Sequence, residues 1–408
     1  MNSTLTLYRL LICHSVVCLF SAFSAYATHI VGADLYYAHI SGNKYKITVA
    51  LYGDCGSVSG AFATLMYSQP QVCIMNGLTS VVTLGLVLDT SASNIEITRL
   101  CPGDSSNCTN PASIIPGIKK FVYSAYYTLP TVSSKWRFIY TGINGSGSSA
   151  GRSPAITNID VGGGVDLIQL IDTLNNSVHN NTSALLTSSQ QTFFCVLQHD
   201  VYQPAAFDPD EDSLTFSLIP AVNSAVGCSG TGTPATYLGA AWPGGTPTTA
   251  STPIQTVSPD SFSLNTATGD LFFHPFYQRS VVVYNIREFR NDTLIGTTQR
   301  EMTVLVIDCD STFPCLKLGP VIALGTSVAA GAVRAELYPN PSNSELTIKI
   351  PHASFTSFAL YDGVGRVLLQ QPLHSDITTV DVSSLSPGLY YVMLKGASGS
   401  EAHKFIKM

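Results

Sequence analysis

The sequence predicts an all-β protein with β-sandwich domains in tandem and a small β-sandwich at its C-terminus. Short segments of alternating apolar and polar residues recur along the chain, separated by Gly, Pro, Asn and Asp. Charged residues make up 11% of the 408 residues, about half their share in an average soluble protein. Helical periodicity is weak, and its one mild candidate is the segment 165–174. Alternation without helices favours packed sheets.

Residues 1–27 have the three-part layout of a secretory signal peptide. One basic residue precedes an apolar run over residues 10–23, and the small residues Ala25 and Ala27 follow it. Small residues at these two positions mark a cleavage site, so we expect the mature protein to begin at Thr28. The alternative is an uncleaved membrane anchor, for which the apolar run is short.

An N-terminal β-rich domain is expected over residues 28–190. Its first two strands are predicted at residues 33–40 and 44–52, where apolar and polar side chains alternate. The residues between them, Ser41-Gly42-Asn43, are typical of a hairpin turn.

A Gly/Ser-rich loop is predicted over residues 142–152 of this domain. It contains a G-x-S-x-G pattern at residues 147–151, which in some hydrolases marks a nucleophilic serine. That motif needs a strand before the turn and a helix after it. Gly and Ser repeat on both sides here, and Pro154 follows, so a flexible loop is the favoured interpretation.

Residues 191–312 predict an Ig- or cadherin-like β-sandwich, including a hairpin that turns at Arg290-Asn291-Asp292. The following segment, 313–334, is apolar but is interrupted by Lys317, Pro320 and several glycines. A membrane span would need about 20 uninterrupted apolar residues. We therefore interpret 313–334 as a linker and expect no integral membrane span once the signal peptide is removed.

Three aspartates, Asp208, Asp210 and Asp212, stand at alternate positions just before a predicted strand. Several carboxylate oxygens in one compact loop suit Ca²⁺. The loop is not an EF-hand, because Ser213 stands at the position of the invariant glycine and Ile219 at that of the bidentate glutamate. The alternative is an acidic turn whose aspartates cap the backbone. Both interpretations stay open at this point, and no other cofactor is indicated.

Eight of the ten cysteines follow the signal peptide, and an even number in an exported chain favours disulfides. They are Cys55, Cys73, Cys101, Cys108, Cys195, Cys228, Cys309 and Cys315. The absence of a Cys-x-x-Cys motif argues against zinc. Pairing of sequence neighbours would give Cys55–Cys73, Cys101–Cys108, Cys195–Cys228 and Cys309–Cys315, one hypothesis among on the order of a hundred pairings.

The last stretch, residues 335–408, has short apolar segments separated by turn residues and predicts a small sandwich. Its distinctive residues are Tyr338, Pro339, Asn340, Pro341, Gly365, Gly388, Tyr390 and Lys404. With these residues the stretch resembles the type A C-terminal sorting domain of the type IX secretion system of Bacteroidota. The resemblance implies recognition by that secretion machinery after Sec export through the periplasm. It also implies that the protein is secreted or displayed on the outer-membrane surface.

The body carries a second resemblance. His29-Ile30-Val31-Gly32 and Leu51-Tyr52-Gly53-Asp54-Cys55 look like the start of Bacteroidota surface proteins associated with gliding motility. In the acidic loop, Glu211 stands where this family usually has glycine. The resemblance implies a surface protein and carries no activity with it.

These features favour a non-enzymatic exported β-protein that serves adhesion, surface coating or binding of an extracellular glycan or protein ligand. Nucleic-acid binding is not expected, because the net charge is −6 and no basic stripe is present. The alternative is a secreted hydrolase acting on polysaccharide or protein. Against it stands the lack of H-E-x-x-H, of a credible nucleophile elbow and of a Cys–His signature.

Overall fold

The computed structural model describes most of the chain from residue 28 onward. The described residues are 28–56, 61–98, 100, 103–144, 150–162, 166–188, 190, 193–224, 228, 232–239, 245–309, 335–350, 355–361, 367–386, 388–396 and 399–408. Among them there is no α-helix, only the 3-10 turns η1 (Ala61–Tyr67) and η2 (Pro259–Ser261). The all-β prediction is confirmed. The predicted signal peptide and the linker 313–334 lie outside the described residues.

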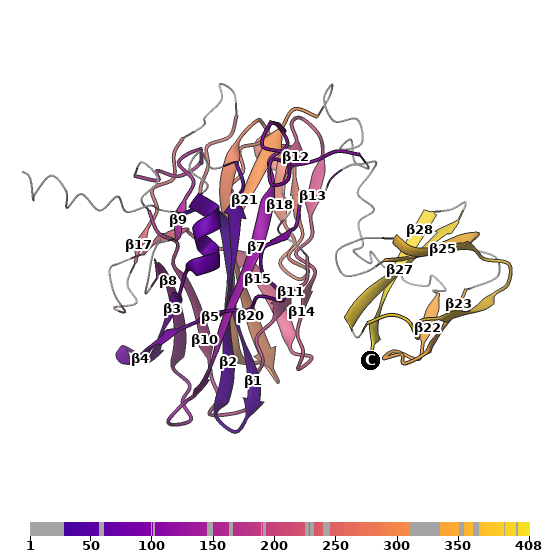
Figure 1. Ribbon diagram of the computed structural model, residues 1–408, viewed down its shortest axis with the longest axis horizontal. Coiled ribbons are helices and arrows are strands. Elements are labelled where there is room, and N and C mark those ends of the chain that lie inside the picture. Colours follow the sequence, from indigo (N-terminus) through magenta and orange to yellow (C-terminus); the bar gives the residue numbers. More distant parts are fainter. Residues whose placement is uncertain are drawn as a thin grey trace, which may run out of the picture.

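A 14-stranded sheet forms the framework of the body (Figure 1). Its main path has the order β4-β3-β8-β10-β21-β1-β2-β7-β5. These strands are β4 (Thr79–Gly85), β3 (Pro70–Asn76), β8 (Trp136–Asn144), β10 (Leu170–Leu174), β21 (Thr293–Ile307), β1 (Thr28–Ser41), β2 (Lys44–Asp54), β7 (Ile118–Thr128) and β5 (Val87–Leu88). Five strands pair off this path: β6 (Ile95–Glu96), β9 (Ala150–Arg152), β12 (Phe194–Cys195), β15 (Ser213–Leu218) and β20 (Arg279–Arg290).

Three small sheets complete the body. The first pairs β11 (Leu185–Leu186) with β14 (Ala206–Phe207), and the second joins β13 (Asp200–Tyr202), β19 (Leu271–Phe273) and β18 (Phe262–Leu264). The third pairs β16 (Val222–Asn223) with β17 (Thr233–Pro234).

The two largest hydrophobic clusters among the described residues of the body draw on successive parts of the chain, and smaller clusters combine residues of both parts. The first gathers buried side chains between Ile30 and Leu174, and the second gathers side chains between Ala184 and Val306. The boundary predicted at 190/191 does not separate two sheets, however. Strand β21 pairs with β20 from its own half and also with β1 and β10 from the first half. In Figure 1 this orange strand lies among indigo and purple ones, and it joins the two halves into one sheet.

The predicted hairpins form where local turn residues specify them. Gly42 adopts φ +52° between β1 and β2. Asn291 and Asp292 both have positive φ, 49° and 59°, between β20 and β21. A two-residue hairpin turn with both residues in the left-handed region matches the twist of its strands, and Asn and Asp tolerate that region well.

Two local predictions for the first half are wrong. The helical candidate 165–174 contains β10, because Leu170, Asp172 and Leu174 alternate inward while β8 and β21 pair with the strand on both sides. The Gly/Ser loop predicted over 142–152 is strand at both ends. Gly142 belongs to β8, and β9 pairs with the start of β1. Residues 145–149, which hold most of the G-x-S-x-G pattern, lie outside the described residues.

The disulfides join distant cysteines rather than neighbours, so the predicted pairings are wrong. The bonds are Cys55–Cys108, Cys73–Cys228 and Cys195–Cys309, with sequence separations of 53, 155 and 114. Strand pairing is the reason. For example, Cys195 in β12 lies beside Ile307 of β21, two residues before Cys309. Cys101 and Cys315 lie outside the described residues.

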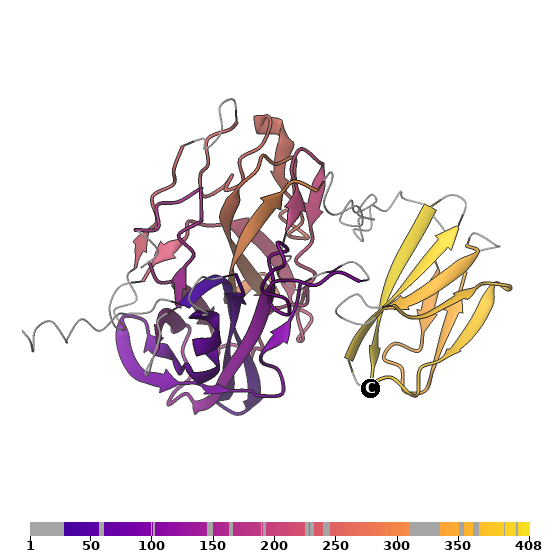
Figure 2. The same ribbon diagram turned by 45° about the horizontal axis from the view of Figure 1, so that its top comes forward.

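The C-terminal stretch forms the small sandwich that was predicted (Figure 2). A three-stranded sheet has the order β22-β23-β26, and a four-stranded sheet the order β25-β24-β27-β28. The strands are β22 (Glu336–Tyr338), β23 (Glu345–Lys349), β24 (Ser357–Tyr361), β25 (Val367–Pro372), β26 (Ile377–Asp381), β27 (Gly388–Gly396) and β28 (Gly399–Lys407). One core, including Leu346, Phe358, Leu394 and Phe405, lies between them.

Candidate functional site: the acidic loop and the sorting tail

The acidic loop before β15 folds as a capped turn. Oδ1 of Asp208 accepts the backbone N–H groups of Asp210 at 2.9 Å and Asp212 at 3.1 Å. Glu211 has φ +65°, a conformation that glycine adopts with less strain. The backbone capping that was predicted as the alternative to Ca²⁺ binding is present, but it uses only one oxygen of Asp208.

Arg290, the last residue of β20, neutralises part of the loop. Its Nε and Nη2 donate to the two carboxylate oxygens of Asp212 at 2.6 and 2.7 Å. Its Nη2 also lies 3.5 Å from Oδ2 of Asp210. The hydrogen bond with Asp212 raises the pKa of Arg290. This bidentate pair fixes Asp212, whose side chain is 2% exposed.

The loop is tied to the segment 180–182, which leads into the second core. The backbone N–H of Thr182 donates to Oδ2 of Asp210 at 2.6 Å. Nη1 of Arg290 donates to the carbonyl of Asn180 at 3.3 Å. The side chain of Asn181 in turn donates to the buried Glu288 at 2.6 Å. Two sequence-distant segments therefore meet at the acidic loop.

The three aspartates offer the ligand set of a hard cation. One carboxylate oxygen from each of Asp208, Asp210 and Asp212 lies within 4.8 Å of the others, and no other such trio of His, Cys, Asp or Glu occurs in the described part of the chain. Oδ2 of Asp208 is buried and has no hydrogen-bond partner. Burial raises the pKa of Asp208 to about 6, with a smaller contribution from the charges of Asp212 and Asp210. The residues present thus fit Ca²⁺, which takes oxygen ligands.

Two further Arg–carboxylate pairs lie in the interior of the described body, and their pairing was not predicted from the sequence. Arg300 donates to both oxygens of Asp34 at 2.6 and 2.7 Å, and Arg152 donates to both oxygens of Glu301 at 2.6 and 2.7 Å. All four residues are at most 6% exposed. Since successive strand residues face opposite sides, the neighbours Arg300 and Glu301 of β21 hold one pair on each side of the sheet. The one visible signal was this charged dipeptide inside a strand that has no other charged residue.

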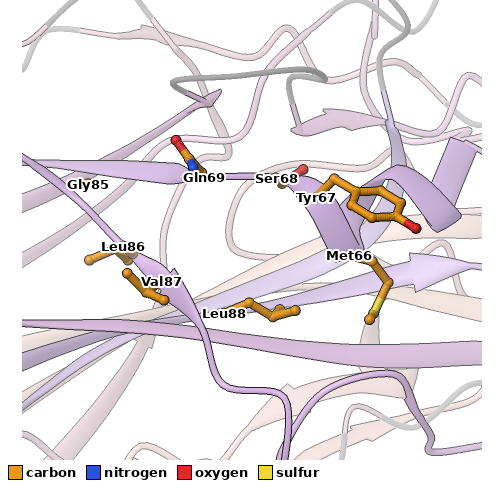
Figure 3. A pocket seen from close by; sticks show the side chains of 8 residues that line it. All are labelled: Met66, Tyr67, Ser68, Gln69, Gly85, Leu86, Val87 and Leu88. Carbon is orange, nitrogen blue, oxygen red and sulfur yellow. The ribbon is translucent and has the colours of Figure 1, made fainter.

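A hollow beside η1 has a volume of about 410 Å³ (Figure 3). It is lined by Met66, Tyr67, Ser68, Gln69, Gly85, Leu86, Val87 and Leu88. A second hollow of about 840 Å³ is lined by Asn76, Gly77, Leu78, Ser134, Lys135, Trp136, Arg137 and Thr173. Neither of these linings contains a carboxylate, whereas glycoside hydrolysis commonly uses two carboxylates a few ångströms apart.

The predicted sorting residues gather at one end of the tail sandwich. Oδ1 of Asn340 accepts the N–H of Ile406 at 2.9 Å, and its Nδ2 donates to the carbonyl of Lys404 at 3.3 Å. The Tyr390 ring stacks on Phe405 with the ring centroids 5.6 Å apart. The Tyr390 hydroxyl donates to the carbonyl of Ser386 at 2.7 Å.

The remaining sorting residues fall at the ends of strands. Tyr338 is the last residue of β22. The peptide bonds Tyr338–Pro339 and Asn340–Pro341 are both cis. Gly388 opens β27 opposite Lys407. Gly365 lies outside the described residues. The Tyr-Pro-Asn-Pro segment is thus held against the end of β28, close to the last residues of the sequence.

Comparison with known families decides what this tail is. Residues 336–408 match the family described as the secretion system C-terminal sorting domain. The predicted resemblance is confirmed. A sorting domain of this kind implies export by the type IX secretion machinery to the cell surface or the surroundings. Over the described residues, the chain contains no helix with the length and apolar character of a membrane span.

Other comparisons add little. No curated protein matches the sequence. Among solved structures, a Dscam1 isoform comprising its N-terminal four Ig domains is 7% identical with a TM-score of 0.16, covering 83% of this chain and 64% of that one. Hemolin, an insect immune protein, is 8% identical with a TM-score of 0.17, covering 84% and 72%. Domains 3–5 of Drosophila OTK are 10% identical with a TM-score of 0.14, covering 93% and 97%.

Proposed function

We propose that the chain is a non-enzymatic surface β-protein, exported by type IX secretion, whose body binds an extracellular glycan or protein ligand. The single observation that carries the proposal is the sorting-domain match at residues 336–408. The three disulfides of the body support it, because such bonds persist in oxidising compartments outside the cytoplasm. Entry into the Sec route through residues 1–27 is part of the proposal.

Binding rather than catalysis is supported by the two hollows of the body. Neither lining brings together the pair of carboxylates that a glycosidase needs. The acidic loop has three carboxylates, but one of them is engaged on both oxygens by Arg290. The exposed parts of the body's sheet and loops offer surface for adhesion at the cell surface.

Deleting residues 336–408 tests the export route. We expect the truncated chain to accumulate in the periplasm of the producing cell, while the complete chain reaches the surface or the medium. A matched control replaces Lys349, an exposed tail residue, with Gln, and it should leave delivery unchanged. Surface delivery of the truncated chain at the wild-type level would contradict the proposal.

Incubating the purified chain with a panel of polysaccharides and extracellular proteins tests the activity. We expect saturable retention on one ligand class with no release of reducing ends or peptides. Catalytic release that persists through purification would establish the hydrolase alternative instead.

A further inference from the structure

Charge balance singles out the acidic loop among the Arg–carboxylate arrangements of the body. Asp208, Asp210 and Asp212 bring three carboxylates together, and Arg290 forms ion pairs with two of them, Asp210 and Asp212. The cluster therefore carries an excess of negative charge when its carboxylates are ionised. Each interior pair, in contrast, matches one guanidinium with one carboxylate. A cluster with surplus negative charge attracts a further cation.

An unpartnered oxygen shows where that cation would sit. Asp208 is 6% exposed, and its Oδ2 has no hydrogen-bond donor while Oδ1 holds two backbone N–H groups. Buried polar atoms in folded proteins are nearly always satisfied, by protein groups, water or ions. The bare oxygen belongs to the same trio whose ligand atoms lie within 4.8 Å of one another.

We propose that Asp208, Asp210 and Asp212 bind one Ca²⁺, which ties the acidic loop to the segment 180–182 between the two cores. Ligands on opposite sides of a Ca²⁺ lie about 4.8 Å apart, because each Ca–O distance is about 2.4 Å. The trio fits within that span. The side chain of Asp210 is 33% exposed, so water can supply further ligands on the open side. The absence of nitrogen and sulfur ligands from the trio favours Ca²⁺ over transition metals.

Arg290 competes with Ca²⁺ for the carboxylates of this site. It occupies both oxygens of Asp212, and its positive charge lies 3.5 Å from Asp210. In the ion-free protein it limits repulsion among the carboxylates. When Ca²⁺ binds, the same charge opposes the ion. Removing it should therefore tighten calcium binding, whereas a simple ion pair between Arg290 and Asp212 predicts no calcium binding at all.

The site links two segments that the sequence separates. Asp210 accepts the N–H of Thr182, and Arg290 donates to Asn180. An ion on Asp210 would hold residues 180–182 in place, just before Ala184 enters the second core. The inference is independent of the proposed export and adhesion function, since it concerns only the folded body.

Calorimetric titration of the purified, chelator-treated full chain with CaCl₂ tests the site. We expect one Ca²⁺ per chain, at least a tenfold loss of affinity in Asp208→Asn, and a several-fold gain in Arg290→Gln. Asp208→Asn keeps Oδ1 for the two N–H groups. If it does not fold, Asp210→Asn replaces it, with the same loss expected.

The matched control is Asp89→Asn, which changes a half-buried aspartate that also caps a turn, through the N–H and hydroxyl of Ser91, but belongs to no such trio. It should bind Ca²⁺ as wild type does. Titration with MgCl₂ should give at least tenfold weaker binding, because Mg²⁺ demands a tighter octahedral shell. No calcium heat from wild type, equal binding by Asp208→Asn, or equal affinity for Mg²⁺ would overturn the proposal.

Discussion

The interior Arg–carboxylate pairs and the acidic loop both join guanidinium to carboxylate groups, but they differ in the ratio of positive to negative charges. Every oxygen of Asp34 has a donor, since Arg300 bonds both and Tyr52 adds its hydroxyl at 2.7 Å. The other N–H groups of Arg300 reach the carbonyls of Ser188 and Leu186 and the hydroxyl of Tyr202. In the acidic loop, Arg290 pairs with two of the three carboxylates, and the third, Asp208, has a buried oxygen without a hydrogen-bond donor. A buried ion pair with equal charges stabilises the fold. A partly exposed cluster with excess negative charge can still bind a cation.

The largest effect is expected from breaking an interior pair. Arg300→Met leaves Asp34 buried without its cation, and removing one partner of a buried pair typically costs about 3–5 kcal/mol. Urea denaturation of the purified chain measures the loss in the free energy of unfolding. In the double variant with Asp34→Asn, no uncompensated charge remains, so part of the loss should be recovered. A loss in the free energy of unfolding below about 1 kcal/mol for Arg300→Met would mean that the Arg300–Asp34 pair is not buried.

A pH effect of somewhat smaller size is expected from Glu288. Burial raises its pKa from 4.5 to about 7, against hydrogen bonds from Asn181, Ala184 and Thr298. The folded protein therefore binds this proton more tightly than the unfolded chain. The stability contributed by Glu288 is fully present below pH 4.5 and is lost as the pH rises to about 7.

The size of this effect follows from the shift. Each pKa unit corresponds to about 1.4 kcal/mol, so the loss amounts to roughly 3.5 kcal/mol at most. Unfolding measurements from pH 4.5 to 7.5 should show wild type losing this stability relative to Glu288→Gln. A constant difference between the two proteins would contradict the assignment.

The smallest effect is expected from the acidic loop in the absence of calcium. Arg290→Gln removes a bidentate pair like that of Arg300, but the Arg290 side chain is 24% exposed. Solvent screens the charges left behind, so the loss should be about 1 kcal/mol, well below that of Arg300→Met. Urea denaturation in chelator measures it. Equal losses in the free energy of unfolding for Arg290→Gln and Arg300→Met would contradict the proposed difference between the acidic loop and the interior pairs.

Local features were predictable from the sequence, and long-range ones were not. The hairpin turns at Gly42 and at Asn291-Asp292 follow from residues that tolerate positive φ. The acidic trio is visible because its members are two residues apart. The sorting tail could be recognised because its motif residues all lie within one stretch of the sequence, residues 336–408.

The features that sequence reasoning missed depend on strand register. Arg300 meets Asp34 across 266 residues, and Arg152 meets Glu301 across 149. The shared sheet fails to follow from the sequence for the same reason, because β21 returns to pair with β1, and the Cys195–Cys309 disulfide depends on the pairing of β12 with β21. Pairing cysteines by proximity in sequence ignores this return. Nor could the sequence show that one Asp208 oxygen has no hydrogen-bond donor, since the fold directs Arg290 and Thr182 to the neighbouring carboxylates instead.

Thermal unfolding with and without calcium tests the contrast most directly. The full chain is heated in chelator and then with CaCl₂ at about 100 times the dissociation constant measured by calorimetry. Mass action at that ratio stabilises the folded state by about 2.7 kcal/mol, which raises Tm on the order of 5 °C. We predict this rise for wild type and Asp89→Asn and its loss in Asp208→Asn. An equal shift in all three proteins, or none in wild type, would contradict a calcium site in the acidic loop.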